Sequence, residues 1–285
     1  MTLTDEEKKL KAELVKQYMA EQEIISKAIF EKMGAQFLKI GKTKAIGLLP
    51  DGNVVMRFLD TYTGTDFVKD GGGNEIAGHM RGLGKMNLEM SSKLFCLLEK
   101  NCDIPNQNIY VDIKNNILVA DAATLLAKDM PFEAVHKGKE IEGVGIGTEF
   151  LYRNFALGSY LDRNPHKEKW QDLRDKNGNG LVETSVKFDP YDPVLPWEYF
   201  ARSGKVSVSD LGDAMDMTER GAKYLTQKFQ EQDMIFADTK FEFGLDKRKK
   251  LILVDEISTG TSRVFKPNKK DQLNELEVYD AVMRM

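Results

Sequence analysis

Cysteine and histidine are scarce in this 285-residue sequence. The two cysteines, Cys96 and Cys102, are too few for the disulfide framework on which small secreted proteins depend. We therefore expect reduced thiols and a cytoplasmic protein. Cys96 lies in an apolar helical stretch, which predicts that it packs as a small hydrophobic side chain. The three histidines do not have the spacing of zinc ligands: they are His79, His136 and His166.

Long apolar runs and an excess of positive charge are also missing. No run of 18 apolar residues occurs, so no membrane span and no membrane partner are expected. The N-terminal segment lacks the apolar centre of a secretory signal, so none is expected there. With 41 basic and 45 acidic residues, the net charge is −4. This balance gives no polybasic signature of nucleic-acid binding, and we expect small-molecule partners instead.

The first clear pattern is a helix over residues 5–33. Thr4 is a suitable N-cap, and Gly34 is a typical C-terminal stop. An apolar stripe follows the helical repeat: Leu10, Leu14, Tyr18, Ile25, Ala28, Ile29 and Met33. We expect this stripe to pack on the body of the protein or on a second subunit, which makes a homodimer possible.

Hairpins and helices then follow one another along the chain. Hairpins are predicted over residues 35–60, turning at Pro50–Asn53, and over residues 108–122, turning at Asn115–Asn116. Helices are predicted over 84–101 and 209–232, whereas residues 164–204 are typical of long loops with short elements. Mixed hairpins and helices favour an α+β fold over a doubly wound parallel sheet.

A third hairpin, Phe236–Arg263, carries charged residues at regular intervals. Because side chains two apart in a strand share a face, Asp238, Lys240 and Glu242 lie together, with Phe241 and Phe243 on the other face. One interpretation is an exposed face with cross-strand ion pairs. The other is a site that binds a divalent cation and an anion, because buried charges need partners.

Two further stretches indicate anion binding. In "KIGKTK" (residues 39–44) a glycine between lysines can bring backbone amides and ammonium groups to a polyphosphate. In "EFLYRNFALGS" (residues 149–159) Arg153 and Ser159 flank a glycine, and arginine suits bidentate capture of phosphate or carboxylate. A surface ion pair is the alternative for Arg153.

Taken in order, these segments resemble the SAICAR synthetase (phosphoribosylaminoimidazole-succinocarboxamide synthase) family from about Lys39 to Phe265. The segments that carry the resemblance are "GKTK", "LEKNCDIPNQNI", "EFLYRNFALGS", "VKFDPYDP" and "DTKFEFG" followed by "LVDEIS". The resemblance implies an α+β fold with a small β-rich ATP-binding lobe and a larger α+β lobe similar to ATP-grasp enzymes. It divides the chain into an additional N-terminal helix (1–36), the small lobe (37–130) and the catalytic lobe (131–285).

The resemblance also implies the reaction. Family members join L-aspartate to an imidazole carboxylate ribonucleotide in purine biosynthesis, using ATP as co-substrate and Mg²⁺. By resemblance, Glu242 and Asp255 hold Mg²⁺ and with it ATP, and Lys42 and Lys44 contact the ATP phosphates.

The remaining roles concern the other substrates. By resemblance, Arg153 and Ser159 hold the phosphate or carboxylate of the ribonucleotide, and Arg263 contacts a substrate anion at the reacting centre. Lys240 and Asp238 line that centre. Lys187 and Asp192 lie on the matching substrate-binding loop.

Four departures leave the second substrate open. Thr259 and Gly260 stand where the family usually has Pro-Asp, and Leu88 replaces the second of two paired asparagines. The segment between Val119 and Glu149 is longer than usual, so the adenine contacts are not assigned, and the C-terminal tail is short. A related ligase with another amine or acid, or a non-catalytic nucleotide-binding homologue, is therefore an alternative.

Overall fold

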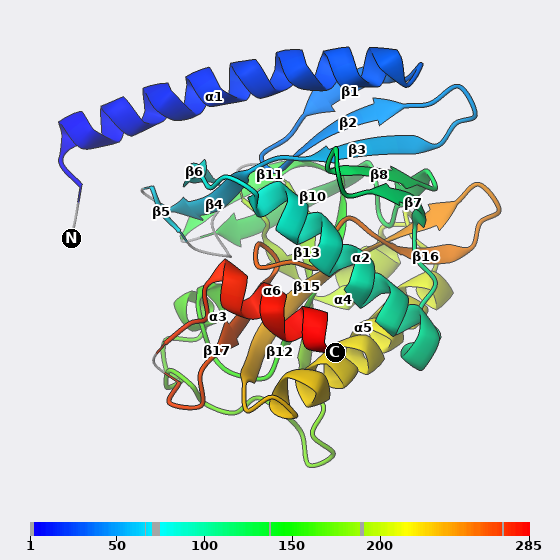
Figure 1. Cartoon of the computed structure of the whole chain (residues 1–285). Coiled ribbons are helices and arrows are strands. Elements are labelled where there is room, and N and C mark those ends of the chain that lie inside the picture. Colours follow the sequence, from blue (N-terminus) through cyan, green and yellow to red (C-terminus); the bar gives the residue numbers. More distant parts are fainter. Residues whose placement is uncertain (1–2, 66, 70–74, 137, 189–190, 270) are drawn as a thin grey trace. The chain divides into compact units, whose positions relative to one another are not determined.

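The computed structural model describes residues 3–65, 67–69, 75–136, 138–188, 191–269 and 271–285 (Figure 1). The chain forms two compact units. Unit 1 contains Met1–Ser92 and Gln107–Ala122, and unit 2 contains Lys93–Asn106 and Ala123–Met285. The functional division into 1–36, 37–130 and 131–285 stays a prediction.

Unit 1 is built on a five-stranded antiparallel sheet. Its strand order is β1 (Gln36–Ile40), β2 (Lys44–Leu48), β3 (Val54–Phe58), β8 (Ile117–Ala120) and β7 (Asn108–Asp112). Both predicted turns are confirmed, since Gly52 and Asn116 have φ values of 84° and 57°, which suit tight hairpin loops. A second, three-stranded sheet consists of β4 (Thr61–Thr65), β5 (Val68–Lys69) and β6 (Glu75–His79).

The predicted N-terminal helix is α1 (Asp5–Lys32), and Thr4 and Glu7 form a capping box at its start. Figure 1 shows α1 lying along β1 and β2. Phe30 is buried between the helix and the sheet, in a cluster with Ala35, Ala45, Val55 and Ile117.

Only part of the predicted apolar stripe of α1 forms this contact, since Ile29 and Met33 pack against the cluster around Phe30. Leu10, Leu14 and Ile25 are exposed, while Ser26 and Phe30 are the buried residues of the helix. Arg57 donates hydrogen bonds to Ser26 Oγ (3.1 Å) and Gln22 Oε1 (2.9 Å). The inward face of the helix therefore contains polar side chains, and a stripe defined only by apolar residues does not include them.

Unit 2 contains a seven-stranded antiparallel sheet. Its main order is β14 (Val194–Leu195), β13 (Leu181–Lys187), β12 (Gly147–Arg153), β15 (Ile235–Asp246) and β16 (Leu251–Val254). Two more strands, β9 (Ala123–Leu125) and β17 (Ser262–Phe265), pair with β15. A separate hairpin is formed by β10 (Met130–His136) and β11 (Lys139–Gly145).

In the described part of unit 2 there are five helices, of which α2 (Leu83–Cys102) is shared between the units. The others are α3 (Ser159–Arg163), α4 (Trp197–Arg202), α5 (Val208–Gln230) and α6 (Glu275–Arg284). Among the described residues, no helix is both long enough and apolar enough to cross a membrane.

One face of the large sheet packs against α5. A Cβ at Gly221 of α5 would lie 3.1 Å from Phe241 Cε2, so helix and strand are in direct contact. Phe150 and Phe243 are fully buried on β12 and β15, with ring centroids 5.5 Å apart. Because side chains alternate along a strand, the charged residues of these strands lie on the opposite face.

Two sequence predictions are wrong. Residues 164–204 were expected to be loops with short elements, but they include the seven-residue strand β13, which pairs along the whole of β12. Cys96 is exposed rather than packed in the core. A period along a helix does not say which side faces inward, and strand pairing is decided by distant residues.

Candidate active site

Three neighbouring strands align charged residues on the face of the sheet away from α5. Across β12 and β15, Glu149 pairs with Glu242 and Arg153 pairs with Asp238, while Leu151 pairs with Lys240. On the other side of β12, Glu149 pairs with Ser185 of β13. The register thus brings two glutamates side by side, an arrangement that is costly unless cations compensate it.

Two lysines provide this compensation. Lys240 Nζ donates to Glu149 Oε1 at 2.6 Å, and Lys187 Nζ donates to both carboxylate oxygens of Glu242 at 2.5 and 2.6 Å. Ser185 Oγ donates to the other Glu149 oxygen at 3.1 Å. Glu149 and Glu242 are buried, so the exposed ion-pair face considered from the sequence is wrong.

Burial and neighbouring charges shift the pKa values of these groups. Burial raises the pKa of Glu242 above its usual value, Lys187 opposes the rise, and Asp255 and Glu149 add to it. Burial alone would lower the pKa of Lys187, but Glu242, Asp255 and Glu149 outweigh it, and the pKa is raised. The pKa of Lys240 is raised in the same way, chiefly by Glu149 and Glu242 against burial. Both lysines therefore stay protonated at neutral pH.

The two aspartates predicted for the site also lie beside this network. Asp255 follows β16 with a φ of 65°, and its charge acts on both Glu242 and Lys187. Asp192 accepts a hydrogen bond from the Phe188 backbone N–H at 2.9 Å, and its charge acts on Lys240. Within the segment "VKFDPYDP", residues 189 and 190 lie outside the described residues.

A second cluster gathers arginines around Asp238. Arg263 donates from Nε to Asp238 Oδ1 at 2.8 Å and from Nη2 to Oδ2. Arg153 donates from Nη1 to the same carboxylate at 3.5 Å. It also donates from Nη2 to Ser159 Oγ at 3.4 Å and from Nε to Glu183 at 2.7 Å. Arg153 is buried, so it is not the surface ion pair that was the alternative from the sequence.

The loop before α3 fits closely around this cluster. Gly158 has a φ of 53°, which disfavours other residues, and a Cβ there would lie 2.6 Å from Arg263 Nη1. The glycine lets the backbone approach the guanidinium and presents Ser159 to Arg153. Sequence spacing indicated the Arg153–Ser159 pair, and the structure adds Arg263 to it.

Lys42 and Lys44 belong to unit 1, in and after the turn between β1 and β2. The Lys44 carbonyl accepts a hydrogen bond from the Gly41 N–H at 2.7 Å, and the Lys42 carbonyl accepts one from Thr61 Oγ1 at 2.5 Å. Lys44 is largely buried, with Nζ 5.2 Å from the centroid of the Phe58 ring. Both lysines are thus held on an ordered turn, and their contact with ATP stays a prediction.

Sequence reasoning missed three charged residues of unit 2. Glu149 lies at the centre of the network. The available signal was the alternation along the strand, which puts Glu149, Leu151 and Arg153 on one face. Glu183 accepts hydrogen bonds from both Arg153 and Arg163, the latter at 3.0 Å. No local signal marked Glu183, because residues 164–204 were assigned to loops, and none marked Arg163, which lies just before them.

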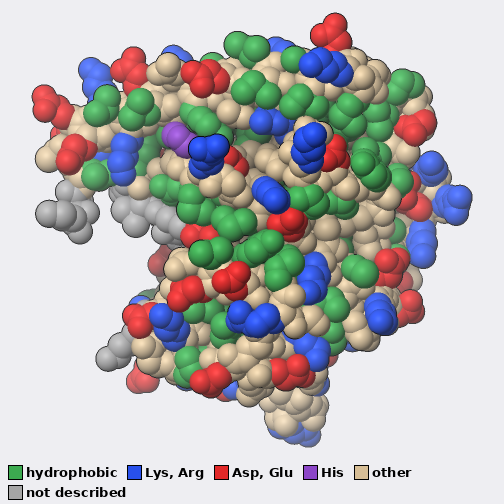
Figure 2. All heavy atoms as spheres, in the orientation of Figure 1, with side chains coloured by type: hydrophobic (Ala, Val, Ile, Leu, Met, Phe, Trp, Pro, Cys, Tyr) green, Lys and Arg blue, Asp and Glu red, His purple; other side chains and the backbone are tan. Residues whose placement is uncertain are grey.

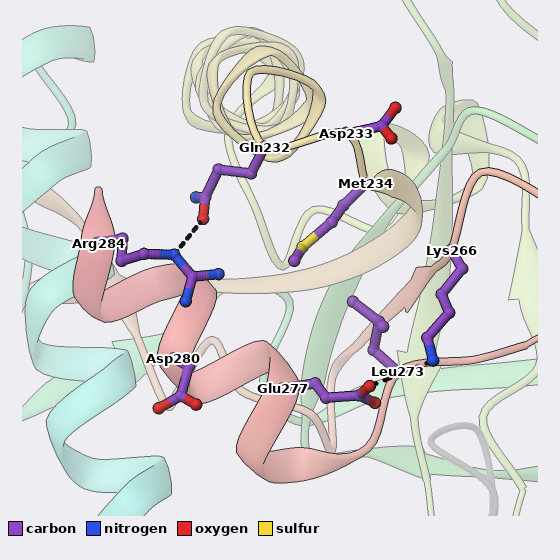
Figure 3. A pocket seen from close by; sticks show the side chains of 8 residues that line it. All are labelled: Gln232, Asp233, Met234, Lys266, Leu273, Glu277, Asp280 and Arg284. Carbon is purple, nitrogen blue, oxygen red and sulfur yellow. Dashed lines mark hydrogen bonds and ion pairs between the residues drawn. The ribbon is translucent and has the colours of Figure 1, made fainter.

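A separate hollow of about 290 Å³ lies away from these strands' charged face. It is lined by Gln232, Asp233, Met234, Lys266, Leu273, Glu277, Asp280 and Arg284. Figure 3 shows Arg284 directed toward Gln232 and Lys266 toward Glu277, at 3.0 and 3.4 Å. None of the predicted site residues lines this hollow.

Comparison with known proteins identifies the family. The sequence model of SAICAR synthetase matches residues 37–280, most of the chain. This chain belongs to the SAICAR synthetase family. The matched region begins after α1, which agrees with the prediction that the N-terminal helix is additional to the family core.

Curated relatives agree with this placement. The phosphoribosylaminoimidazole-succinocarboxamide synthase of Clostridium tetani is 28% identical over 228 residues, which are 79% of this chain and 90% of that protein. The synthase of the same name from Thermococcus kodakarensis is 29% identical over 239 residues, 82% of this chain and 85% of that protein.

Solved structures confirm the α+β fold of the SAICAR synthetases. A structure described as SAICAR synthetase (Type-2) in complex with ADP has a TM-score of 0.67 and 22% identity, covering 86% of this chain and 95% of that one. The SAICAR synthase of Saccharomyces cerevisiae complexed with SAICAR has a TM-score of 0.60 and 15% identity, covering 84% of this chain and 78% of that one.

Proposed function

We propose that this protein is a carbon–nitrogen ligase that joins L-aspartate to a carboxyaminoimidazole ribonucleotide at the expense of ATP, in purine biosynthesis. The observation that carries the proposal is the buried charged face of β12, β13 and β15 in a chain of the SAICAR synthetase family. Clusters of buried charged groups with shifted pKa values are typical of functional sites. We also propose a cytoplasmic location, in keeping with the reaction.

The chemistry requires activation of a carboxylate. A carboxylate does not react with an amine at neutral pH, so its oxygen first attacks the γ-phosphorus of ATP, giving an acyl phosphate and ADP. The amine nitrogen of aspartate then attacks the acyl carbon, and phosphate leaves as the amide forms and a proton is released. Both steps develop negative charge on oxygen, which fixed cations stabilise.

Lys240 and Lys187 are suited to that stabilisation. Their raised pKa values keep them as ammonium groups, so they act as fixed positive charges rather than bases. Lys240 is anchored by Glu149 at 2.6 Å, and Lys187 by Glu242. We assign Lys240 to the reacting carboxylate, and Lys187 and Asp192 to the substrate loop beside it.

The arginine cluster is suited to the phosphate of the ribonucleotide. Arg153 and Arg263 present planar guanidinium groups, and Ser159 adds a hydroxyl. Asp238 accepts hydrogen bonds from both arginines, so we assign it a positioning role at the reacting centre. Glu183 fixes the far side of Arg153.

The carboxylates of Glu242 and Asp255 fit a magnesium ion that accompanies ATP. Their charges act on each other, since Asp255 contributes to the raised pKa of Glu242, and a bound cation would offset this repulsion. No cluster of three or more acidic, histidine or cysteine ligands occurs among the described residues. Mg²⁺ commonly takes only one or two carboxylates and completes its shell with phosphate oxygens and water. Bound there, it would neutralise the transferred phosphoryl group. For Lys42 and Lys44 of unit 1 we keep the role that the family resemblance implies, contact with ATP phosphates.

The departures from the family pattern bear differently on this function. Leu88 is fully buried in a core cluster with Phe58, Leu118 and Ala120, so it supports packing in unit 1. Gly260 has room for a side chain, because a Cβ there would contact only Ser258 Oγ, at 3.4 Å. Aspartate therefore remains the proposed amine. We expect the absence of an acid at Gly260 to affect only how well the enzyme distinguishes aspartate from acidic analogues.

The test is ADP release with the imidazole carboxylate ribonucleotide, ATP, Mg²⁺ and a panel of amino acids. We expect release to require every component and to be fastest with aspartate. Gly260→Asp should make the enzyme more selective for aspartate over acidic analogues. We expect the change in this selectivity to correspond to about 1–3 kcal/mol or less. Activity with an uncharged amine and none with aspartate would replace this function by that of a related ligase. ATP binding without any turnover would indicate a non-catalytic homologue.

A further inference from the structure

The outward face of α1 is an apolar surface on a helix that the family model does not cover. Three large side chains on it are strongly exposed: Leu10 (61%), Leu14 (52%) and Ile24 (69%). Figure 2 shows hydrophobic side chains lying among acidic and basic ones along α1. The opposite face of α1, with Phe30, already packs on the sheet of unit 1. Leu10 and Leu14 are neighbours one helical turn apart, and Ile24 lies further along the same face. Large apolar side chains gathered on one exposed face can mark an interaction surface.

The spacing of this face is that of a coiled-coil seam. The positions alternate in steps of four and three residues: Leu10, Leu14, Gln17, Glu21, Ile24 and Ala28. All six are exposed. A repeat of 3.5 residues lets two helices keep one seam in contact, and two polar residues at its centre favour one register over others.

The order of residues along the seam is symmetric about Met19. In an antiparallel pair of identical helices, Leu14 meets Ile24, Leu10 meets Ala28, and Gln17 meets Glu21. Apolar residues then face apolar ones, and a glutamine amide faces a carboxylate. A parallel pair would instead place Glu21 against its own copy, where like charges repel.

Charges beside the seam agree with the antiparallel register. Glu13 precedes Leu14 and Lys27 precedes Ala28, so the register brings Glu13 of one helix next to Lys27 of the other. Lys27 Nζ lies 2.6 Å from Glu23 of its own helix and 5.0 Å from the centroid of the Phe37 ring, so pairing with Glu13 of the second copy would replace these contacts. Over Asp5–Lys32 the helix has seven acidic and six basic residues, a balance that does not favour an anionic lipid surface.

We propose that the outward face of α1 binds the same face of α1 in a second copy of this chain, as an antiparallel helix pair. The pair is isologous, because each chain gives the same residues to the contact. The seam is short and contains polar positions, so we expect a dimer that dissociates on dilution. The proposal does not depend on the catalytic assignment.

Sedimentation of the full chain over a hundredfold range of concentration tests the surface. We expect a monomer–dimer equilibrium that Leu14→Glu with Ile24→Glu shifts to monomer, because charges would enter the seam. Lys16→Glu, on an exposed position outside the seam, should leave it unchanged. A chain that is monomeric throughout, or a dimer that survives the double change, would overturn the proposal. Both altered side chains are exposed, and circular dichroism verifies that the helix remains.

Charge exchange and cross-linking test the register. Glu13→Lys and Lys27→Glu should each weaken the dimer, and the two changes together should restore it. In a chain with Cys96→Ser and Cys102→Ser, Leu14→Cys with Ile24→Cys should give a disulfide-linked dimer, and Leu14→Cys alone should not. The two positions lie about 15 Å apart along one helix, too far to bond within a chain. A dimer linked by Leu14→Cys alone would show a parallel pair and contradict the proposal.

Discussion

Lys187 and Glu242 form a two-point ion pair across the sheet, although they lie on β13 and β15 with β12 between them. The ammonium group donates to both carboxylate oxygens, at 2.5 and 2.6 Å. Lys187 thereby occupies the position of a counter-charge for a carboxylate whose pKa is raised by burial and by Asp255. We infer that this pair holds the proposed cation site ready, with the glutamate ionised.

The first prediction concerns the two proposed metal ligands. Glu242→Gln and Asp255→Asn should each lower kcat by about 100-fold or more, since a metal-centred transfer depends on ligand charge for several kcal/mol. The fold should persist, because each change nearly conserves volume. Steady-state ADP release and thermal unfolding are the measurements.

Glu231→Gln is the matched control, because Glu231 is an exposed carboxylate that also pairs with a lysine, at 2.8 Å. It should turn over as the parent does. Parent-like rates in both site variants with Mg²⁺ would show that these carboxylates hold no essential metal.

The second prediction is a shift in the pH profile. In its proposed role as a metal ligand Glu242 must be ionised, so we expect activity above the pKa of this group and its loss as the pH falls through that value. Lys187 holds that pKa down against burial, and Lys187→Met should raise it. The acid limb of kcat should therefore move to higher pH, in addition to any fall in the maximal rate.

Lys228→Met provides the control for this profile, since its partner Glu231 is exposed and outside the site. The position of the limb is measured at fixed Mg²⁺ with saturating substrates. An unmoved limb in Lys187→Met would mean that another group governs the acid side.

The third prediction concerns Arg153. Arg153→Lys should raise the KM for the ribonucleotide about 10- to 100-fold, corresponding to ~1.5–3 kcal/mol for hydrogen bonds to a charged group. Lysine keeps the charge but cannot contact Glu183, Asp238 and Ser159 at once, as the guanidinium does. The KM values for ATP and aspartate should change much less.

Arg174→Lys is the comparison, because Arg174 forms an exposed ion pair with Asp172. Little kinetic effect is expected there. If Arg153→Lys left the ribonucleotide KM as it was, Arg153 would be a structural residue of the sheet.

The fourth prediction separates backbone strain from the position of Arg263. Gly158→Ala and Gly178→Ala both place an alanine at positive φ, 53° and 79°, and each should cost about 1 kcal/mol or more of unfolding free energy, with the larger cost at Gly158, whose ψ of −137° lies outside the left-handed helical region. Only Gly158→Ala also puts a methyl group 2.6 Å from Arg263 Nη1, while Gly178 has no atom within 4 Å.

We therefore expect a raised ribonucleotide KM in Gly158→Ala and parent kinetics in Gly178→Ala. Chemical denaturation measures the loss of unfolding free energy, and steady-state kinetics measures the KM for the ribonucleotide. Equal kinetics in the two variants would mean that Arg263 does not contact the substrate.

Sequence by itself determined where helix ends and hairpin turns lie and which residues share one face of a strand. Thr4 and Gly34 marked the ends of α1, and Gly52 and Asn116 marked hairpin turns, because these positions depend on capping and on local backbone freedom. The two-residue period of β15 grouped Asp238, Lys240 and Glu242, since alternation follows from the geometry of one strand.

Tertiary structure decided which groups meet and which face is inward. Glu149 and Glu183 joined the site only through the pairing of β12 with β13 and β15, which depends on residues distant in sequence. Likewise, the helical period of α1 identified a stripe with Leu10 and Leu14 but left its direction open. Packing of Phe30, Ile29 and Met33 against the sheet left Leu10 and Leu14 facing outward, because the burial of one face is settled by the partner that covers it.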